Sequence, residues 1–299
     1  MLDPNHNVSK LKVNTASNLK KVGHWLGGLQ LGLTEKKGKT VLAEKHQSGP
    51  YTAQRSFYPE GGICHLILLH PPGGLVEGDC LELSTTLDKQ SHCVMTTPSA
   101  GKVYHCESIA AGQKQEFNLK DQSVLEWFPQ ETILFANSKA NLHTSISIEK
   151  DAHFIGWELV CLGRPISNDN YEGGFLRQHI EIKVDSKSIL NERLVIDSMN
   201  DKDPALGADW GFADYTVFGS LYITGASKAH LDIARKVIAE FDTIQNPLRI
   251  GVSLVDGVIV CRGLTAQSRH LKAAFMQIWS ALRHELLGVE MNTPRIWNT

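Results

Sequence analysis

One short segment, His70–Asp79, constrains the fold of this chain more than any other, because two prolines and three glycines stand within its ten residues. Proline fixes φ and removes a backbone donor, and glycine adopts positive φ without steric cost, so the segment cannot continue a helix or a central strand. Strand-like apolar runs precede it at 63–69 and follow it at 81–87. We therefore expect a β architecture in which an ordered loop joins two strands, with Asp79 closing the turn by accepting backbone N–H bonds.

Strand patterns dominate the rest of the chain. Alternation of apolar and polar residues is clearest in Leu142–Ile148, and it recurs at 92–96, 123–127, 132–136, 153–161, 174–184, 189–196, 216–224 and 257–262. Helical spacing appears twice and late, at about 228–243 and 266–287, and Thr265 and Gly288 are expected to cap and end the second helix. The apolar faces of these two helices are formed by Leu231, Ala234, Ile238 and Phe241, and by Leu271, Phe275, Ile278, Leu282 and Leu286. The pattern predicts a mainly β fold with two helices in the C-terminal third, but it does not distinguish a β-sandwich from a β-helix.

Composition and charge exclude several classes of protein. The chain has 299 residues, of which 42% are hydrophobic, so it can bury a full core. Its net charge of −2 and the absence of a basic stripe argue against a nucleic-acid partner. Its apolar runs are far shorter than the roughly 20 residues that span a bilayer, and we expect a cytoplasmic protein without a membrane segment. Residues 1–24 have little apolar pattern and are expected to form a mobile extension before the fold begins near Trp25.

No catalytic motif is convincing. The segment Gly32–Thr40 has five residues between its glycines, where a phosphate-binding loop has four, and it leads into a strand, so an exposed hairpin turn is expected. Three cysteines neighbour a histidine, as Cys64-His65, His92-Cys93 and His105-Cys106. All three pairs lie in strand-like segments, where adjacent side chains point to opposite faces and cannot hold one ion. We expect free thiols and no enzymatic activity, although a hydrolase built from a distant Cys–His pair stays open as an alternative.

Further blocks follow His70–Asp79 in order, and together they carry a family resemblance. They are Thr96–Tyr104, Leu125–Ile133, Trp157–Glu158, Leu162–Pro165 and the tail Pro294–Thr299. This set resembles the urease accessory protein UreD family, called UreH in some organisms, over residues 25–299. The chain departs from the usual pattern at 166–169 and at Glu77 and Ser99, where glycine is common. The resemblance implies a layered, β-helix-like fold and a single UreD-like domain over 25–299.

The resemblance also implies a function. Proteins of this family bind the accessory protein UreF and, through it, the GTPase UreG, and the complex docks on apo-urease, so we expect a dimeric assembly held through UreF. Such a scaffold helps to install the dinickel centre, and nickel would be cargo in transit with no tightly bound cofactor. A stand-alone nickel-carrying metallochaperone with a discrete metal site is the alternative. It predicts stoichiometric nickel retained by the isolated protein, whereas a conduit predicts weak binding that is rapidly lost.

Carboxylates are the candidate ligands of a nickel path, because a passage for a hydrated divalent cation needs oxygen ligands that exchange fast. The candidates are Asp79, Glu131 and Glu158. A structural role is the alternative for each: Asp79 closes a turn, Glu131 holds the strand after Pro129, and Glu158 pairs with Arg164.

Rigid loops and a few aromatic and arginine side chains are expected to recognise the partners. Tyr104, Arg164, Arg295 and Trp297 are the candidate anchors, although Arg295–Trp297 could equally fold into the chain's own core. The full set of predicted partner-binding or structural motif residues is His70, Pro71, Pro72, Gly73, Gly74, Gly78, Asp79, Tyr104, Pro129, Gln130, Glu131, Arg164, Arg295 and Trp297.

Overall fold

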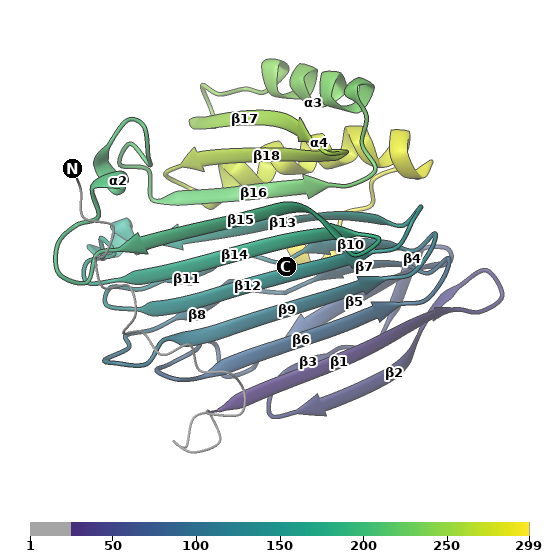
Figure 1. Ribbon diagram of the computed structural model, residues 1–299, viewed down its shortest axis with the longest axis horizontal. Helices are drawn as coiled ribbons and strands as arrows, with labels where there is room; N and C mark the ends of the chain where they lie inside the picture. Colours follow the sequence, from purple (N-terminus) through teal and green to yellow (C-terminus); the bar gives the residue numbers. More distant parts are fainter. Residues whose placement is uncertain (1–24, 299) are drawn as a thin grey trace.

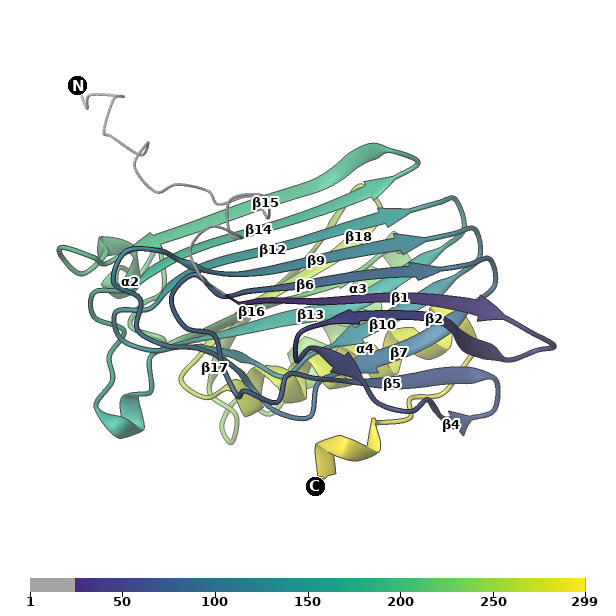
Figure 2. The ribbon, with the colours of Figure 1, turned by 90° about the horizontal axis from the view of Figure 1, so that it is seen from below.

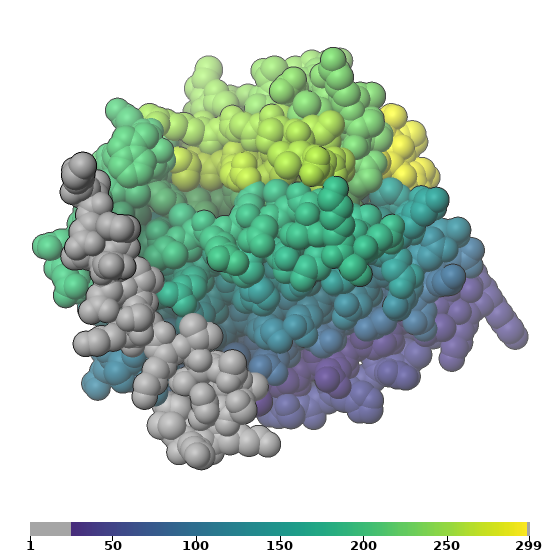
Figure 3. Space-filling view, viewed as in Figure 1, coloured from purple at the N-terminus to yellow at the C-terminus, as the bar shows by residue number. Residues whose placement is uncertain are grey.

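The computed structural model describes residues 25–298, which form two stacked β-sheets with helices outside one of them (Figures 1 and 2). The first sheet has seven strands, in the order β15 (Lys187–Asp197), β14 (Phe175–Val184), β12 (Lys139–Ile148), β9 (Ala111–Leu119), β6 (Cys80–Leu87), β1 (Leu26–Glu35) and β2 (Thr40–Ser48). Its outer face is the broad surface in Figure 3, on which successive strands form adjacent bands of colour. The predicted extension at 1–24 lies outside the described residues, and a single domain over 25–299 stays a prediction.

The second sheet has eleven strands. Its main path is β17 (Leu248–Val255), β18 (Val258–Thr265), β16 (Val217–Ile223), β13 (His153–Leu162), β10 (Val124–Phe128), β7 (His92–Thr96), β5 (Ile63–Leu69) and β3 (Thr52–Ala53). Three short strands join it at the side: β4 (Phe57–Glu60), β8 (Gly101–Val103) and β11 (Thr132–Leu134).

The chain winds from one sheet to the other as in a β-helix. Between β5 and β14 each turn adds a strand to both sheets, and the pairs β6–β9, β9–β12, β5–β7 and β7–β10 are parallel. Antiparallel pairs occur at the ends, as in the hairpin β1–β2, where the sequence predicts an exposed turn. The prediction of a layered, mainly β fold is confirmed, and the winding shows that the arrangement resembles a β-helix and not a β-sandwich.

The two predicted helices are confirmed. Helix α3 (Lys228–Glu240) and helix α4 (Ser268–Leu287) cover the outer face of the second sheet, and α4 buries Leu271, Phe275 and Ile278 against β13, β16 and β18. Gly288 ends α4 in the left-handed conformation with a φ of 66°, as predicted. The expected cap is wrong by two residues: Gln267 precedes the helix, and Thr265 ends β18 and accepts a hydrogen bond from the Gln267 N–H at 3.3 Å.

Short helical turns complete the fold: η2 (Pro165–Ser167), α2 (Pro204–Gly207) and η3 (Arg295–Asn298). Among the described helices, none is both long and apolar enough to cross a lipid bilayer.

Candidate functional site

The loop His70–Asp79 joins β5 to β6 and pairs with the next motif block. The Leu75 N–H donates to the Lys102 carbonyl at 2.8 Å, and the Tyr104 N–H donates to the Leu75 carbonyl at 2.9 Å. Gly74 permits this approach, because a Cβ at its position would overlap the Tyr104 ring. Gly73 and Gly78 adopt positive φ, and the loop's remaining motif residues, His70, Pro71 and Pro72, lead into it from β5.

Asp79 closes the turn, as its structural alternative predicts. One carboxylate oxygen accepts the Val76 N–H at 3.0 Å, and the other accepts the Trp25 N–H at 3.3 Å. The side chain therefore ties the loop to the segment that enters β1.

Three motif blocks meet at one end of the parallel strands and enclose a cavity of about 260 Å³. Hydrogen bonds link them: the Gln130 N–H donates to Thr97 Oγ1 at 2.9 Å, and the Gly101 N–H donates to the Glu131 carbonyl at 2.9 Å. Pro129 accepts the indole N–H of Trp157 at 2.9 Å. The lining includes His70, Pro71, Gly73, Gly74, Thr97, Ser99, Lys102, Gln113, Trp127, Pro129 and Gln130.

Polar groups without a protein partner continue from this cavity into the space between the sheets. Trp127 lines the cavity and is 1% exposed, and its indole N–H has no hydrogen-bond partner among the described residues. Gln115 Oε1 on β9 is also buried without a hydrogen-bond partner among the described residues, and Gln115 lies beside Thr144 of β12 in the strand register. Buried polar atoms of this kind are commonly satisfied by water, so the interior is chemically suited to being wet.

Glu158 projects from β13 into this interior. It accepts hydrogen bonds from the Thr144 hydroxyl and, at 2.6 Å, from the Gln178 amide on β14. Burial raises the pKa of the Glu158 carboxyl above its ordinary value. A carboxylate held between two neutral donors, with no cationic partner among residues 25–298, can receive a passing cation.

The structure does not bring the three predicted acids together. Asp79 closes its turn, Glu131 accepts a hydrogen bond from the Ser268 hydroxyl of α4 at 3.2 Å, and Glu158 alone faces the interior. The expected Glu158–Arg164 pair is wrong. Arg164 lies in the loop beyond the end of β13, where it meets Asp169 at 3.4 Å.

The anchor candidates divide into surface and tail residues. Tyr104 and Arg164 both pack on Phe135, with ring centroids 4.8 Å apart and the guanidinium carbon 3.9 Å above the ring. Arg295 is exposed. Trp297 folds into the chain's own core, since its indole N–H donates to Thr96 Oγ1 at 2.8 Å.

A buried ionic network was missed by the sequence analysis. The Arg283 guanidinium of α4 donates to Glu126 at 2.9 Å and to Glu60 at 2.6 Å, and the two carboxylates also meet His92 at 2.7 Å and His65 at 2.5 Å. The available signals were an acid inside the apolar run Leu125–Phe128 and an arginine beside the apolar stripe of α4.

Two Cys–His pairs separate as predicted: Cys64 and Cys93 enter the core between the sheets, while His65 and His92 meet Glu60 and Glu126. The third pair follows β8, where His105 forms an isolated antiparallel bridge with Ser138 and not a full strand; His105 is exposed and Cys106 is buried, so these side chains separate as well. All six cysteines are free thiols. Among the described residues, no group of three or more His, Cys, Asp or Glu side chains is arranged to hold a metal ion.

Glu77, where the family pattern usually has glycine, holds a neighbouring turn. Its carboxylate accepts hydrogen bonds from the Ser108 hydroxyl at 2.7 Å and from the N–H groups of Ile109, Ser108 and Glu107 at 2.7, 2.8 and 3.2 Å. These hydrogen bonds lower the pKa of Glu77 to about 2, and the bond from the Ser108 hydroxyl has the largest effect.

We expect Glu77→Gln to make amide hydrogen exchange at residues 107–109 several-fold faster, because the charged acceptor is lost. In the wild type this protection should persist above pH 4.5 and disappear as the pH falls through about 2, since a lowered pKa means that stability is lost on protonation. Exchange measured by NMR or mass spectrometry checks both expectations, with exposed Glu107→Gln as the control. Unchanged exchange in Glu77→Gln would show that the Glu77 carboxylate does not hold the turn at residues 107–109.

Comparison with known proteins identifies relatives along nearly the whole chain. The family model described as "UreD urease accessory protein" matches residues 26–298. A urease accessory protein UreD of Aliivibrio fischeri (strain MJ11) is 38% identical over 295 residues, covering 96% of this chain and 99% of the relative. Proteins of the same name from Escherichia coli and Alcanivorax borkumensis are both 36% identical, over 276 and 271 residues; the alignments cover 92% and 91% of this chain and 97% and 90% of the relatives.

Proposed function

Because the chain belongs to the UreD family of urease accessory proteins, we propose that it is the scaffold that docks UreF and UreG on apo-urease and gives nickel a passage toward the dinickel centre. Family membership itself implies a role in urease maturation and contact with urease and other accessory proteins. Its relatives are named accessory proteins and not enzymes, so the GTP chemistry belongs to UreG in this proposal.

One observation carries the nickel passage: the carboxylate of Glu158 between the two sheets, next to polar atoms that lack protein partners. A hydrated cation crossing an apolar interior would lose most of its hydration energy. Oxygen atoms of Glu158, Thr144 and Gln115 along the way would replace part of that hydration without holding the ion permanently. The geometry favours a passage over a carrier, because of these three residues Glu158 alone offers a charged oxygen, while Thr144 and Gln115 offer neutral oxygens that hold a divalent cation weakly.

The test is reconstitution. This chain, carrying an affinity tag, is co-expressed with UreF, UreG and apo-urease and purified; nickel, bicarbonate and GTP are added, and ureolysis is measured. Co-purification of the partners, with activity that depends on this chain, supports the scaffold. If the partners do not co-purify and the isolated chain instead retains stoichiometric nickel, the metallochaperone alternative replaces the proposal.

We expect Glu158→Gln to lower nickel-dependent activation about tenfold or more while the partners still co-purify, since tenfold corresponds to roughly 1.4 kcal/mol of lost stabilisation of the cation. Burial raises the pKa of Glu158 in the folded protein. The protonated side chain therefore contributes fully to the stability of the wild type below pH 4.5, and this contribution is lost as the pH rises through the pKa of the folded state. The variant should therefore unfold at neutral pH no more easily than the wild type.

The matched control is Glu131→Gln, whose carboxylate meets α4 and not the interior. It should activate urease like the wild type. If the two variants are equally active, Glu158 does not line the passage.

A further inference from the structure

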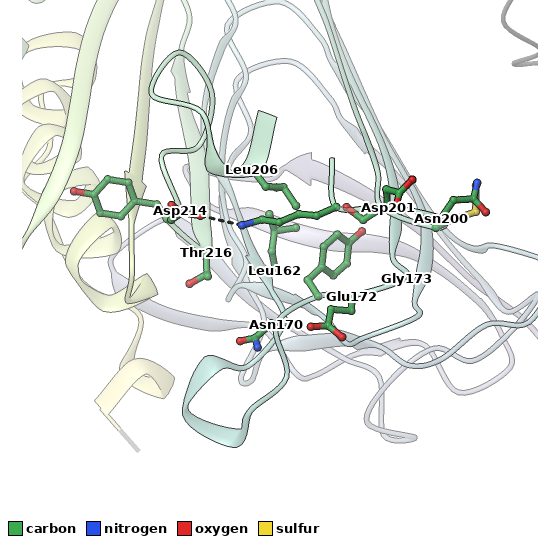
Figure 4. A pocket seen from close by; sticks show the side chains of 14 residues that line it. Leu162, Asn170, Glu172, Gly173, Asn200, Asp201, Leu206, Asp214 and Thr216 are labelled. Atoms are coloured by element: carbon green, nitrogen blue, oxygen red, sulfur yellow. Dashed lines mark hydrogen bonds and ion pairs between the residues drawn. The ribbon is translucent and has the colours of Figure 1, made fainter. Parts of the chain in front are cut away.

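A second, larger cavity of about 630 Å³ lies outside the site described above. It is enclosed by the segment that follows β13 and by the segment between β15 and β16. Figure 4 shows Asn170 and Glu172 on one side of it and Asp201, Leu206 and Asp214 on the other. Figure 1 places α2, which contributes Leu206, at one end of the stacked sheets.

The charged side chains of this cavity are mainly acidic. Glu172, Asp201 and Asp214 are exposed, and the one lysine, Lys202, pairs with Asp214 at 3.0 Å. Glu172 and Asp201 have no ion-pair partner among residues 25–298. A ligand bound here would therefore be cationic.

Tyr171 supplies an independent indication of a ligand. It lines the cavity and is 2% exposed, yet its hydroxyl has no hydrogen-bond partner in the described part of the chain. Leaving a buried hydroxyl unsatisfied costs about 1–3 kcal/mol, so such a group calls for an explanation.

The position of the Tyr171 ring is fixed by its own segment. The residue adopts a positive φ of 60°, which is rare for a bulky side chain. Its ring lies against Gly174, where a Cβ would come within 2.5 Å of it. The hydroxyl is thus held in one place.

The apolar part of the lining suits a long side chain with a charged end. Leu162 and Leu206 are 2% and 8% exposed and present hydrocarbon surface beside the tyrosine ring. Arginine combines an apolar stem with a planar guanidinium that donates several hydrogen bonds and stacks on aromatic rings. The cavity volume also fits a side chain better than a single ion.

The loops at the rim point to a protein as the source of that side chain. Ile166, in the turn just before Asn170, is 99% exposed, and Trp210, between α2 and Asp214, is 78% exposed. Large apolar side chains at this exposure are costly unless a partner covers them, and tryptophan is enriched where partners bind.

We propose that this cavity receives an arginine side chain of a protein partner, with its stem on Leu162 and Leu206 and its guanidinium on Tyr171, Glu172 and Asp201. The inference rests on the proposed function, because it takes the partner from the urease maturation assembly. The Tyr171 hydroxyl accepts one guanidinium N–H, and the two carboxylates attract the positive charge of the guanidinium.

The test uses acetyl-arginine amide as a probe of the purified full chain, with ligand-observed saturation-transfer NMR and acetyl-citrulline amide as the uncharged isostere. We expect saturable binding of the arginine probe only. Tyr171→Phe should weaken it about fivefold, the effect of one lost hydrogen bond, and E172Q/D201N should weaken it at least tenfold. An equal affinity for the citrulline probe, or wild-type affinity in both variants, would overturn the proposal.

Thermal unfolding separates this role from a structural one, since Tyr171→Phe removes a group without a protein partner and should leave the unfolding midpoint unchanged or higher. In the co-purification assay, E172Q/D201N should capture less of the partners, whereas D232N/E240Q, which changes exposed acids of α3, should capture as much as the wild type. Wild-type capture by E172Q/D201N would also overturn the proposal. If the wild type captures no partner, the proposed function fails while the NMR titration still decides whether the cavity binds arginine.

Discussion

Replacing Arg283 with methionine should lower the free energy of unfolding by about 3–5 kcal/mol, because it leaves the buried carboxylate of Glu126 and the partly buried carboxylate of Glu60 without their arginine. Arg283 and Glu126 are both fully buried, and the guanidinium donates to Glu126 at 2.9 and 3.0 Å and to Glu60 at 2.6 Å. The same side chain also donates to the Glu290 carbonyl, so it joins α4, the second sheet and the C-terminal segment. Urea unfolding followed by tryptophan fluorescence measures the loss.

Lys236→Met is the matched control for this change. Lys236 lies on α3 with its ammonium 4.0 Å from Glu240, and both side chains are exposed. Surface pairs of this kind contribute about 0.3–0.5 kcal/mol, so the control should unfold nearly as the wild type does. A similar small loss in Arg283→Met would show that the buried network does not stabilise the fold.

The pH dependence of stability gives a second measure of the same network. Burial alone would raise the pKa of Glu126, but hydrogen bonds and charge from His92 and Arg283 lower it below its ordinary value of 4.5, and His65 and Arg283 do the same for Glu60. Lowered carboxyl pKa values contribute stability that is complete above pH 4.5 and is lost as the pH falls through the folded-state values. The difference between the wild type and Arg283→Met should therefore shrink in acid.

The strands could be predicted from the sequence because period-two alternation is a local property. β5 was predicted at its observed bounds, and β7 likewise. The winding could not be predicted, since β1 pairs in parallel with β6 across a long intervening segment and the alternation does not say which strands meet. The start of α4 was misplaced because Thr265 has a cap-forming side chain but is the last residue of β18.

The candidate site was only partly predictable for the same reason. The motif blocks that enclose the cavity are visible as Pro- and Gly-rich segments, and Asp79 closes its turn through neighbours in the loop. The environment of Glu158 depends on Thr144 and Gln178 of two other strands, which no local pattern indicates. Arg283 meets Glu60 across 223 positions of the chain, so the ionic network appears only in three dimensions.

Gly163→Ala should be the most damaging single-methyl change in the motif blocks, with a loss of roughly 2–5 kcal/mol in the free energy of unfolding. Gly163 follows β13 with a φ of 73°, and its N–H donates to the Leu134 carbonyl at 2.7 Å. An added Cβ would overlap the Asp169 carbonyl oxygen and lie 2.7 Å from the Tyr171 nitrogen. Both are backbone atoms, which cannot rotate out of the way as a side chain can. The free energy of unfolding measured in urea should therefore fall by the cost of this steric strain in addition to the cost of the left-handed conformation.

Gly38→Ala separates these two costs. Gly38 also has a positive φ, 78°, but a Cβ there would meet no atom within 4 Å, so alanine should cost only about 1 kcal/mol, the conformational part alone. The excess loss in Gly163→Ala then measures how tightly the loop 164–171 is packed against the end of β13, and the loop holds Tyr171 beside the larger cavity. If the two variants lose the same free energy of unfolding, the loop moves aside for the methyl group. Glycine would then be needed in the Leu162–Pro165 block only for its backbone conformation.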